Sequence, residues 1–416
     1  MDMLAEPIDS WLRNACREAR DAGRQLAQAP ARQRDAALVA VAGAIRRHRE
    51  AIMMANAQDI AAYSGTDAFR DRLLLTEPRI EAMAAGVEIV AGLPDPLGGA
   101  LAEWERPNGL VIRRVPQPIG VIGMIYESRP NVGADAAAIC LKSGNAVILR
   151  GGSESQHSAR AIHEAISEGL QEAGLPGSCV QIAPTTDREF VAAMLRATGM
   201  IDLIIPRGGK SLVERVQREA RVAVLAHAEG LNHTYVDRGA DLAMARTILA
   251  NAKMRRTGVC GATETLLIDG AVAEAWLPVL VGDLRALGCD CRGDERARAI
   301  VAMGEAEFDT EWLDAVISVG VVDGLEGALA HIGRYGSSHT DAIVTEDAEV
   351  AGRFLAGIDS AVGMWNASTQ FCDGGEFGFG AEIGIATGRV HARGPVGPAQ
   401  LTTFRYHVVG TGQVRP

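Results

Sequence analysis

The sequence is poor in aromatic residues, which make up 4% of the chain. It has no apolar run of the ~18–20 residues that a membrane-spanning helix requires. Its formal net charge is −11, so a general nucleic-acid-binding face is not expected. With 47 glycines and abundant alanine, an aromatic-poor interior favours helices packed closely on sheets over an all-β sandwich.

The cysteines also exclude a structural class. They are odd in number and scattered, which does not describe a disulfide framework. The first residues lack a basic segment followed by an apolar one, so we expect no signal peptide. We therefore expect a soluble cytoplasmic protein with reduced thiols. The cysteines are Cys16, Cys140, Cys179, Cys260, Cys289, Cys291 and Cys372.

The chain has 416 residues, of which 48% are hydrophobic, enough for two or three domains. Apolar residues recur at helical spacing over the first ~90 residues. From residue 118 apolar strands alternate with helices, and a second alternating region begins near residue 230. Near-continuous apolar strands between helices predict parallel sheets that are covered on both faces. The sequence thus predicts two α/β domains in series.

Two further segments predict a small β structure. Asn108-Gly109 is a strong hairpin signal, and its flanks are long enough for a two-stranded ribbon. The run Leu401–Val409 is strand-like and lies beyond the last domain. We expect it to pair with the ribbon, and we hypothesise that the pair forms an oligomerisation flap.

Two glycine motifs fall short of nucleotide-binding signatures. Gly209-Lys210-Ser211 follows a strand and precedes a helix, but Ile204 stands where a Walker A loop needs glycine. The turn still offers backbone N–H groups and a helix N-terminus to an anion. Gly378-Phe379-Gly380 lacks the third glycine of a dinucleotide fingerprint. A kinase module is therefore disfavoured, and a nicotinamide cofactor would bind without the usual motif.

Cys260 is the leading candidate nucleophile. Small residues flank it, and Lys253, Arg255 and Arg256 precede it. Positive charge lowers the pKa of a thiol and so favours the reactive thiolate. Cys289 and Cys291 lie two apart, but nothing nearby completes a metal site, and we expect no metal.

Other polar residues stand at strand ends. Asn131, with Arg129 just before it, follows the first strand of the alternating region, where open α/β sheets place ligands. Asn131 is either a helix cap or a catalytic donor. Arg129 is either an anion ligand or a solvated charge. For His227 and His233, a structural role is favoured over that of a catalytic base.

Six segments together resemble the gamma-glutamyl phosphate reductases, a family within the aldehyde dehydrogenase superfamily. The resemblance runs over essentially the whole chain. It implies an aldehyde dehydrogenase-like fold of two parallel-sheet α/β domains with a small β oligomerisation flap. The expected boundaries are 1–102 and 117–227 for the NADP-binding domain, 228–392 for the catalytic domain, and 103–116 with 393–416 for the flap. The segments are RRVPQPIGVIGMIYESRPNV, CLKSGNAVILRGGSE, IIPRGGKSL, NAKMRRTGVCGATETLLID, YGSSHTDAIVTED and VGMWNASTQFCDGGEFGFGAEIGIATGR.

The resemblance also implies roles for single residues. Cys260 is the expected nucleophile and Asn131 the side-chain donor to the oxyanion. The implied reaction is reduction of L-glutamyl 5-phosphate by NADPH through a cysteine thioester, the second step of proline biosynthesis from glutamate. The expected cofactor-binding residues are Arg150, Ser153, Gly208, Gly209 and Glu311, and the expected substrate cations are Arg129, Lys253 and Arg255.

One departure from the superfamily is informative. Hydrolytic aldehyde dehydrogenases carry a water-activating glutamate at a position that His227 occupies here, unless the alignment shifts by two residues to Glu229. The resemblance further implies a homo-oligomer and functional coupling to glutamate 5-kinase, without nucleic acid or membrane partners. The alternatives are a hydrolytic aldehyde dehydrogenase and a cysteine acyltransferase without a redox cofactor. The second requires a histidine beside Cys260, and no sequence feature places one there.

Overall fold

The computed structural model describes residues 7–127 and 129–415. The chain divides into two compact units, each described here by itself. Unit 1 holds residues 1–226, 378–384 and 396–416, and unit 2 holds 227–377 and 385–395. The expected catalytic domain, 228–392, therefore differs from unit 2, because residues 378–384 return to pack on unit 1. The prediction that the chain has no signal peptide rests in part on residues 1–6, which lie outside the described residues.

Unit 1 is built on a four-stranded parallel sheet with the order β5-β4-β3-β6. Its strands are the apolar segments that the alternation predicted, so this prediction is confirmed. Strand β3 is buried along its whole length, as expected for a strand covered on both faces. The strands are β3 (Val121–Tyr126), β4 (Ala146–Arg150), β5 (Val180–Ile182) and β6 (Leu203–Arg207).

The predicted helical start of the chain is also confirmed. Pro78 lies in the first turn of α5, where its missing N–H costs nothing, and Gly92 caps the other end. Gly144 has φ +75 just after α6, a conformation that glycine adopts without strain. The helices of unit 1 are α1 (Ile8–Gln28), α2 (Ala31–Arg47), α3 (Arg49–Ala62), α4 (Asp67–Leu73), α5 (Glu77–Ala91), α6 (Val132–Lys142), α7 (Gln156–Glu172), α8 (Arg188–Arg196) and α9 (Lys210–Glu219), with short 3-10 turns at Ser153–Ser155, Gly177–Cys179 and Ala399–Leu401.

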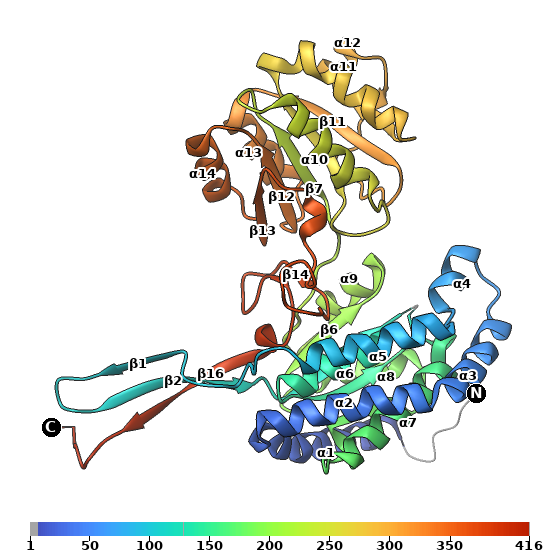
Figure 1. Ribbon diagram of the computed structural model, residues 1–416, viewed down its shortest axis with the longest axis vertical. Coiled ribbons are helices and arrows are strands. Elements are labelled where there is room, and N and C mark those ends of the chain that lie inside the picture. The colour runs from blue at the N-terminus through green and yellow to red at the C-terminus, as the bar shows by residue number, and fades with distance from the viewer. Residues whose placement is uncertain (1–6, 128, 416) are drawn as a thin grey trace. The chain divides into compact units, whose positions relative to one another are not determined.

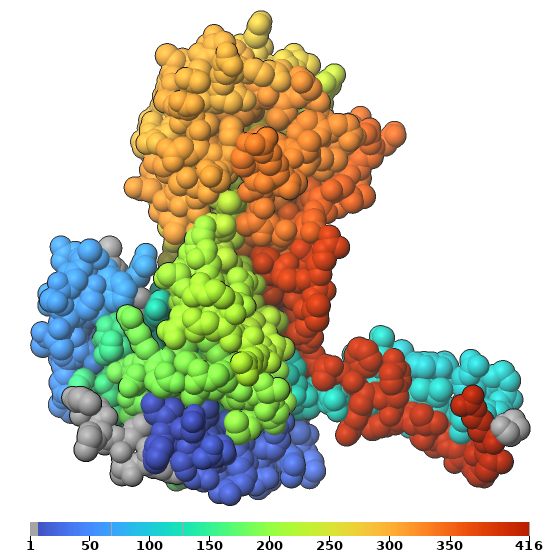
Figure 2. Space-filling model, turned by 180° about the vertical axis from the view of Figure 1, so that it is seen from behind, coloured from blue at the N-terminus to red at the C-terminus, as the bar shows by residue number. Residues whose placement is uncertain are grey.

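A three-stranded antiparallel ribbon extends from the rest of unit 1 (Figures 1 and 2). Strands β1 (Ala102–Glu105) and β2 (Val111–Pro118) form the predicted hairpin, with Gly109 at φ +81 in its turn. Strand β16 (Thr402–Val409) pairs with β2 along eight residues. The expected pairing of the terminal strand with the ribbon is thus confirmed.

Unit 2 carries a seven-stranded sheet with the order β10-β9-β11-β8-β7-β12-β13, and all of its pairs are parallel. Neighbouring residues of one strand enter different cores: Leu266 packs with α10 and α11, and Leu267 packs with α13 and α14. Helices therefore cover both faces, as predicted. The strands are β7 (Asn232–Val236), β8 (Thr263–Asp269), β9 (Asp290–Gly293), β10 (Gly304–Glu305), β11 (Val316–Val322), β12 (Thr340–Val344) and β13 (Val362–Trp365).

The remaining elements of unit 2 are helices and one short ribbon. Asp side chains cap the N-termini of α10, α11, α12 and α14, which satisfies backbone N–H groups in the first turn of each helix. No helix in the described residues is long and apolar enough to cross a membrane. The elements are α10 (Leu242–Met254), α11 (Gly270–Ala286), α12 (Glu295–Ile300), α13 (Gly324–Tyr335), α14 (Ala348–Gly357), a 3-10 turn at Thr369–Phe371, β14 (Ile385–Ala386) and β15 (Gly394–Pro395).

Candidate functional site

In unit 1 the candidate residues follow the carboxyl ends of the strands. Strands β3 and β6 are neighbours, but the chain leaves them toward opposite edges of the sheet, and ligands bind at such a reversal in open α/β sheets. The Gly208-Gly209 turn follows β6, and the Gly209 N–H lies 3.4 Å from Glu127 Oε2. A Cβ on Gly208 would lie 2.5 Å from the same oxygen. A larger residue at 208 would therefore require the Glu127 side chain to shift.

The structure separates two readings of Asn131. It stands at the N-cap position of α6, yet its side chain makes no capping hydrogen bond within the described residues. Its Nδ2 instead donates to Asp135 Oδ2 at 2.9 Å. Burial raises the pKa of Asp135 to about 6, against the opposing effects of the Asn131 bond and the Arg207 charge. Asp135 thus orients an amide group that has a second N–H to offer.

A small cavity of about 70 Å³ gathers these side chains within unit 1. Arg129 and Asn131, which the sequence indicated, line it together with Asp135, Arg207 and Glu382. Sequence reasoning missed Arg207, although it directly follows the predicted strand 201–206 and ends β6 just before Gly208-Gly209. The cavity holds two guanidinium groups and an amide donor together with the carboxyl groups of Asp135 and Glu382, and Arg207 Nη2 lies 3.9 Å from Glu382 Oε1. The guanidinium groups and the amide are the part of this lining that suits an anionic ligand.

Arg150 ends β4 and is 8% exposed. Its Nη2 donates to the Thr186 carbonyl at 2.5 Å, while its Nε has no hydrogen-bond partner in the part of the chain that the structure describes. Burial lowers the pKa of this guanidinium from its ordinary value. Ser153 is exposed in the turn that follows β4. A buried cation with an orphaned N–H fits an anionic group of a bound nucleotide.

In unit 2 the candidate nucleophile lies at the amino ends of the strands. Cys260 stands between α10 and β8, and Asn232 at the start of β7 holds its backbone. The Asn232 amide donates to the Cys260 carbonyl at 2.6 Å and accepts from the Thr340 N–H at 3.1 Å. A Cβ on Gly230 would lie 2.2 Å from the Cys260 oxygen, so no other residue fits there without moving the loop.

Cys260 differs from the other six cysteines, all of which lie in described residues. It is partly exposed and they are buried. Burial raises the pKa of Cys16 to about 11 and that of Cys179 to about 12, and it raises the pKa of Cys140 still further. Because the thiolate is the reactive form, these buried thiols are poor nucleophiles. Exposure alone makes Cys260 the best placed of the seven.

Two histidines lie beside Cys260. The ligand-capable side-chain atoms of His227, Cys260 and His339 all lie within 4.8 Å of one another. His227 Nδ1 is 2.8 Å from the Ile385 carbonyl, which can only accept, so the neutral ring carries its lone pair on Nε2. No sequence feature placed a histidine beside Cys260, whereas the structure brings two there. His227 and His339 are distant in sequence, and the sheet brings their strand ends together.

The cations expected near Cys260 are placed differently. Lys253 is fully buried, with its Nζ 2.6 Å from Glu264 Oε2. Burial raises the pKa of Glu264 to about 7, although the Lys253 charge opposes this. The Lys253 ammonium thus forms a buried ion pair with Glu264. This placement does not agree with the expectation that Lys253 contacts the substrate. Arg255, the second expected cation, is exposed. Glu311, which was expected at the cofactor, accepts a hydrogen bond from the Gly230 N–H through its Oε1 at 2.8 Å.

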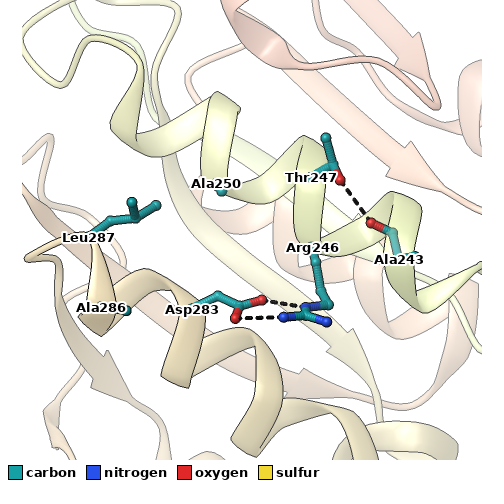
Figure 3. Close-up of a pocket in the computed structure, with 7 residues that line it drawn as sticks. All are labelled: Ala243, Arg246, Thr247, Ala250, Asp283, Ala286 and Leu287. Carbon is teal, nitrogen blue, oxygen red and sulfur yellow. Dashed lines mark hydrogen bonds and ion pairs between the residues drawn. The ribbon is translucent and has the colours of Figure 1, made fainter.

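Unit 2 also has a pocket that none of these residues lines. It is an open groove of about 480 Å³ between α10 and α11 (Figure 3). Its charged groups, Arg246 and Asp283, bond to each other through two contacts of 2.5 and 2.9 Å. Since the polar atoms of the groove satisfy one another, we assign it no function.

Comparison with known proteins agrees with the resemblance. The sequence model described as the aldehyde dehydrogenase family matches residues 9–304. A gamma-glutamyl phosphate reductase of Acidiphilium cryptum is 71% identical over 420 residues, covering 100% of both chains. One of Gluconobacter oxydans is 69% identical, covering 95% of this chain and 94% of the relative.

Solved structures show the same fold. The crystal structure of gamma-glutamyl phosphate reductase from Thermotoga maritima superposes with a TM-score of 0.95 at 42% identity, covering 97% of this chain and 100% of that one. An acetylating aldehyde dehydrogenase of Geobacillus thermoglucosidasius has a TM-score of 0.68 at 16% identity, covering 98% of both chains, and supports the fold alone. The predicted fold class is confirmed.

Proposed function

Because the chain belongs to the gamma-glutamyl phosphate reductase family of the aldehyde dehydrogenases, we propose that it reduces L-glutamyl 5-phosphate to L-glutamate 5-semialdehyde and phosphate. In this proposal the reductant is NADPH, and the reaction is the second step of proline biosynthesis from glutamate. The observation that carries the proposal is the placement of Cys260, the one partly exposed cysteine of the seven, beside two histidines.

The first chemical step uses residues of unit 2. His227 takes the thiol proton of Cys260 through its Nε2 lone pair, and the thiolate attacks the γ-carbonyl carbon. The C–O bond to phosphate breaks, and phosphate leaves with the bonding electrons. The product is a thioester on Cys260. Histidine at position 227, in place of a carboxylate base, suits an enzyme that must not hydrolyse this thioester.

By resemblance, Asn131 is assigned as a side-chain donor of an N–H to the oxyanion that forms during the attack. Asp135 holds the amide by its other N–H, so the donor is oriented before substrate arrives. One such donor contributes about 10²–10³ in rate. The same donor role applies when the reduced intermediate collapses and expels the thiolate.

When bound, NADPH supplies the hydride that reduces the thioester. Arg150, Ser153, Gly208 and Gly209 of unit 1 hold it in this proposal. Two features support that assignment: the Nε of Arg150, which has no hydrogen-bond partner among the described residues, and the N-terminus of α9, which follows the Gly208-Gly209 turn. Glu311 of unit 2 is assigned to the nicotinamide ribose by resemblance.

The substrate phosphate and α-carboxylate need local cations in a chain of net charge −11. Arg129 and Arg207 line one small cavity with Asn131, and they are the side chains we assign to these anions. Arg255 is exposed and remains in the proposal. Lys253 is not included in the proposal, because its ammonium group is buried in an ion pair with Glu264.

The ribbon of β1, β2 and β16 is assigned to a homo-oligomer. Both of its edge strands are open within the described residues, and its side chains include exposed Trp104, Tyr406 and Val408. Open strand edges and exposed apolar residues favour pairing with another copy. A solution mass equal to that of one chain at all concentrations would contradict this assignment. Cytoplasmic location and functional coupling to glutamate 5-kinase belong to the same proposal.

The deciding experiment runs the reaction backwards. We expect the protein to oxidise glutamate 5-semialdehyde with NADP⁺ only when phosphate or arsenate is present, because a nucleophile other than water must release the acyl group. Oxidation without either anion would instead indicate a hydrolytic aldehyde dehydrogenase. An absence of NADP⁺ reduction in both conditions would contradict the proposed function.

A further inference from the structure

The group of His227, Cys260 and His339 has the composition of a zinc site. Thiolate sulfur and imidazole nitrogen are the ligands that zinc prefers in proteins. A tetrahedral ion with bonds of about 2.0–2.3 Å would hold these atoms about 3.5 Å apart. They already lie within 4.8 Å, so small side-chain rotations complete the geometry.

Hydrogen bonds prepare both rings for this role. His227 donates its Nδ1 proton to the Ile385 carbonyl, which leaves a lone pair on Nε2 and fixes the ring. Such a carbonyl partner is typical of metal-binding histidines. His339 is 1% exposed, and its Nδ1 lies 2.9 Å from Thr340 Oγ1.

The second ring nitrogen of His339 is an independent sign of a ligand. Nε2 is buried and has no hydrogen-bond partner among the residues that the structure describes. Buried polar atoms are nearly always bonded, so an orphan here calls for an explanation. Burial, followed by the nearby His227, lowers the pKa of His339 to about 3. The ring is therefore neutral near pH 7, as a metal ligand must be.

From this geometry we infer that His227, Cys260 and His339 form a binding site for a thiophilic divalent cation such as Zn²⁺, and that the bound ion switches the enzyme off. On binding, the S–H bond of Cys260 breaks, the proton passes to solvent, and a metal–sulfur bond forms. Water fills the fourth position. The sulfur lone pair is then held by the metal and cannot attack a carbonyl. The inhibitory consequence rests on the proposed function, whereas the binding itself does not.

The test uses the full reduced chain and Co²⁺, whose bond to a thiolate gives a near-ultraviolet absorption band. We expect the band to appear on titration and to disappear when Zn²⁺ displaces Co²⁺. It should vanish in Cys260→Ser. His227→Gln and His339→Gln should each weaken binding at least about tenfold, because even outer partners of a metal ligand change affinity about 10–100-fold. Cys291→Ala is the matched control and should keep the band, since it alters only the buried Cys289–Cys291 pair.

Alkylation gives a second readout that is independent of turnover. Saturating Zn²⁺ should slow iodoacetamide labelling of Cys260, followed by peptide mass, and a chelator should restore the rate. A band that survives both histidine variants, or that is lost in Cys291→Ala, overturns the inference. So does Cys260 labelling that Zn²⁺ leaves unchanged. A chain that binds Co²⁺ as described but lacks reductase activity would contradict the proposed function and leave the metal site standing.

Discussion

The two parallel sheets of this protein carry their candidate functional groups at opposite strand ends. In unit 1, Arg150, Arg207 and the Gly208-Gly209 turn stand at or just beyond the carboxyl ends of β4 and β6. In unit 2, Cys260 precedes β8 and His339 precedes β12. The first arrangement follows the general rule for open α/β sheets, so the sequence could locate it. The second does not follow that rule.

The difference separates two kinds of task. Carboxyl-end loops of unit 1 offer backbone N–H groups and arginines, which suit the binding of anionic groups. The amino ends in unit 2 collect a thiol and two imidazoles, which suit covalent and proton-transfer chemistry. We expect substitutions in unit 2 to change the chemical step, and most of those in unit 1 to change binding. The exceptions are Asn131 of unit 1, which is assigned to the oxyanion, and Arg255 and Glu311 of unit 2, which are assigned to binding.

The largest effect is expected at Cys260. Cys260→Ser should lower reductase turnover by about 10⁴-fold or more, as removal of a catalytic nucleophile does in other enzymes. NADPH binding, followed by fluorescence, should be unchanged because Cys260 is not among the residues assigned to the cofactor. Cys291→Ala serves as the control and should retain turnover. Near-normal turnover of Cys260→Ser would remove the nucleophile assignment.

Asn131→Ala should lower kcat by about 10²–10³-fold, the usual cost of losing one oxyanion donor. KM should change little, because the donor acts on charge that develops after binding. Steady-state kinetics with glutamyl phosphate or with the reverse reaction measures both. A change in KM alone would move Asn131 from the chemistry to the binding group of unit 1.

Gly230→Ala tests how the amino-end cluster is held. The new Cβ would collide with the Cys260 carbonyl and displace the loop, and a displacement of about 1 Å costs about 10²-fold in rate. Gly282→Ala is the matched control, since a Cβ there meets nothing within 4 Å on an exposed turn of α11. That change should stabilise the helix by about 1 kcal/mol without loss of rate. Equal activity of both variants would show that Gly230 does not position Cys260.

Asp135→Asn should change how stability depends on pH. The folded-state pKa of Asp135 is about 6, above the ordinary 3.8, so the folded protein holds this proton to higher pH than the unfolded chain does. Stability from this group is present below pH 4 and is lost as the pH rises through 6. Relative to the wild type, the variant should gain about 2–3 kcal/mol in the free energy of unfolding between pH 4 and pH 7, as measured by urea unfolding. Parallel stability curves would contradict the raised pKa.

The smallest effect is expected at the cofactor. Arg150→Ala should lower the preference for NADPH over NADH by about tenfold, since one charge-assisted hydrogen bond contributes about 1.5 kcal/mol or more. The ratio of kcat/KM for the two cofactors measures it. Arg160→Ala, an exposed arginine on α7, is the control. If the ratio for Arg150→Ala stays at the wild-type value, Arg150 has no role in selecting the 2′-phosphate.

Local patterns predicted the elements well. Pro78 and Gly92 mark the two ends of α5, Gly144 follows the end of α6, and Asn108-Gly109 forms the hairpin turn. These features were predictable because each one depends on the backbone preferences of one or two residues. The pairing of β16 with β2 was also expected, although the strands lie far apart in sequence. For the helix ends and turns the signal lies within the segment itself.

The surroundings of Cys260 were not predictable in this way. Lys253 and two arginines precede Cys260 in the sequence, but in the fold Lys253 is buried and forms an ion pair with Glu264. It brings His227 and His339 to the sulfur instead, because β7 pairs with both β8 and β12 and so aligns their amino ends.

The sequence by itself thus determined the strands, helices and turns, and through its motifs the family and the candidate nucleophile. Those features depend on neighbours along the chain or on patterns that relatives share. Only the tertiary structure decided which charged and titratable side chains meet Cys260, Asn131 and Arg150. The physical reason is that strand order, rather than sequence spacing, sets which strand ends are adjacent, and burial then decides which charges are neutralised.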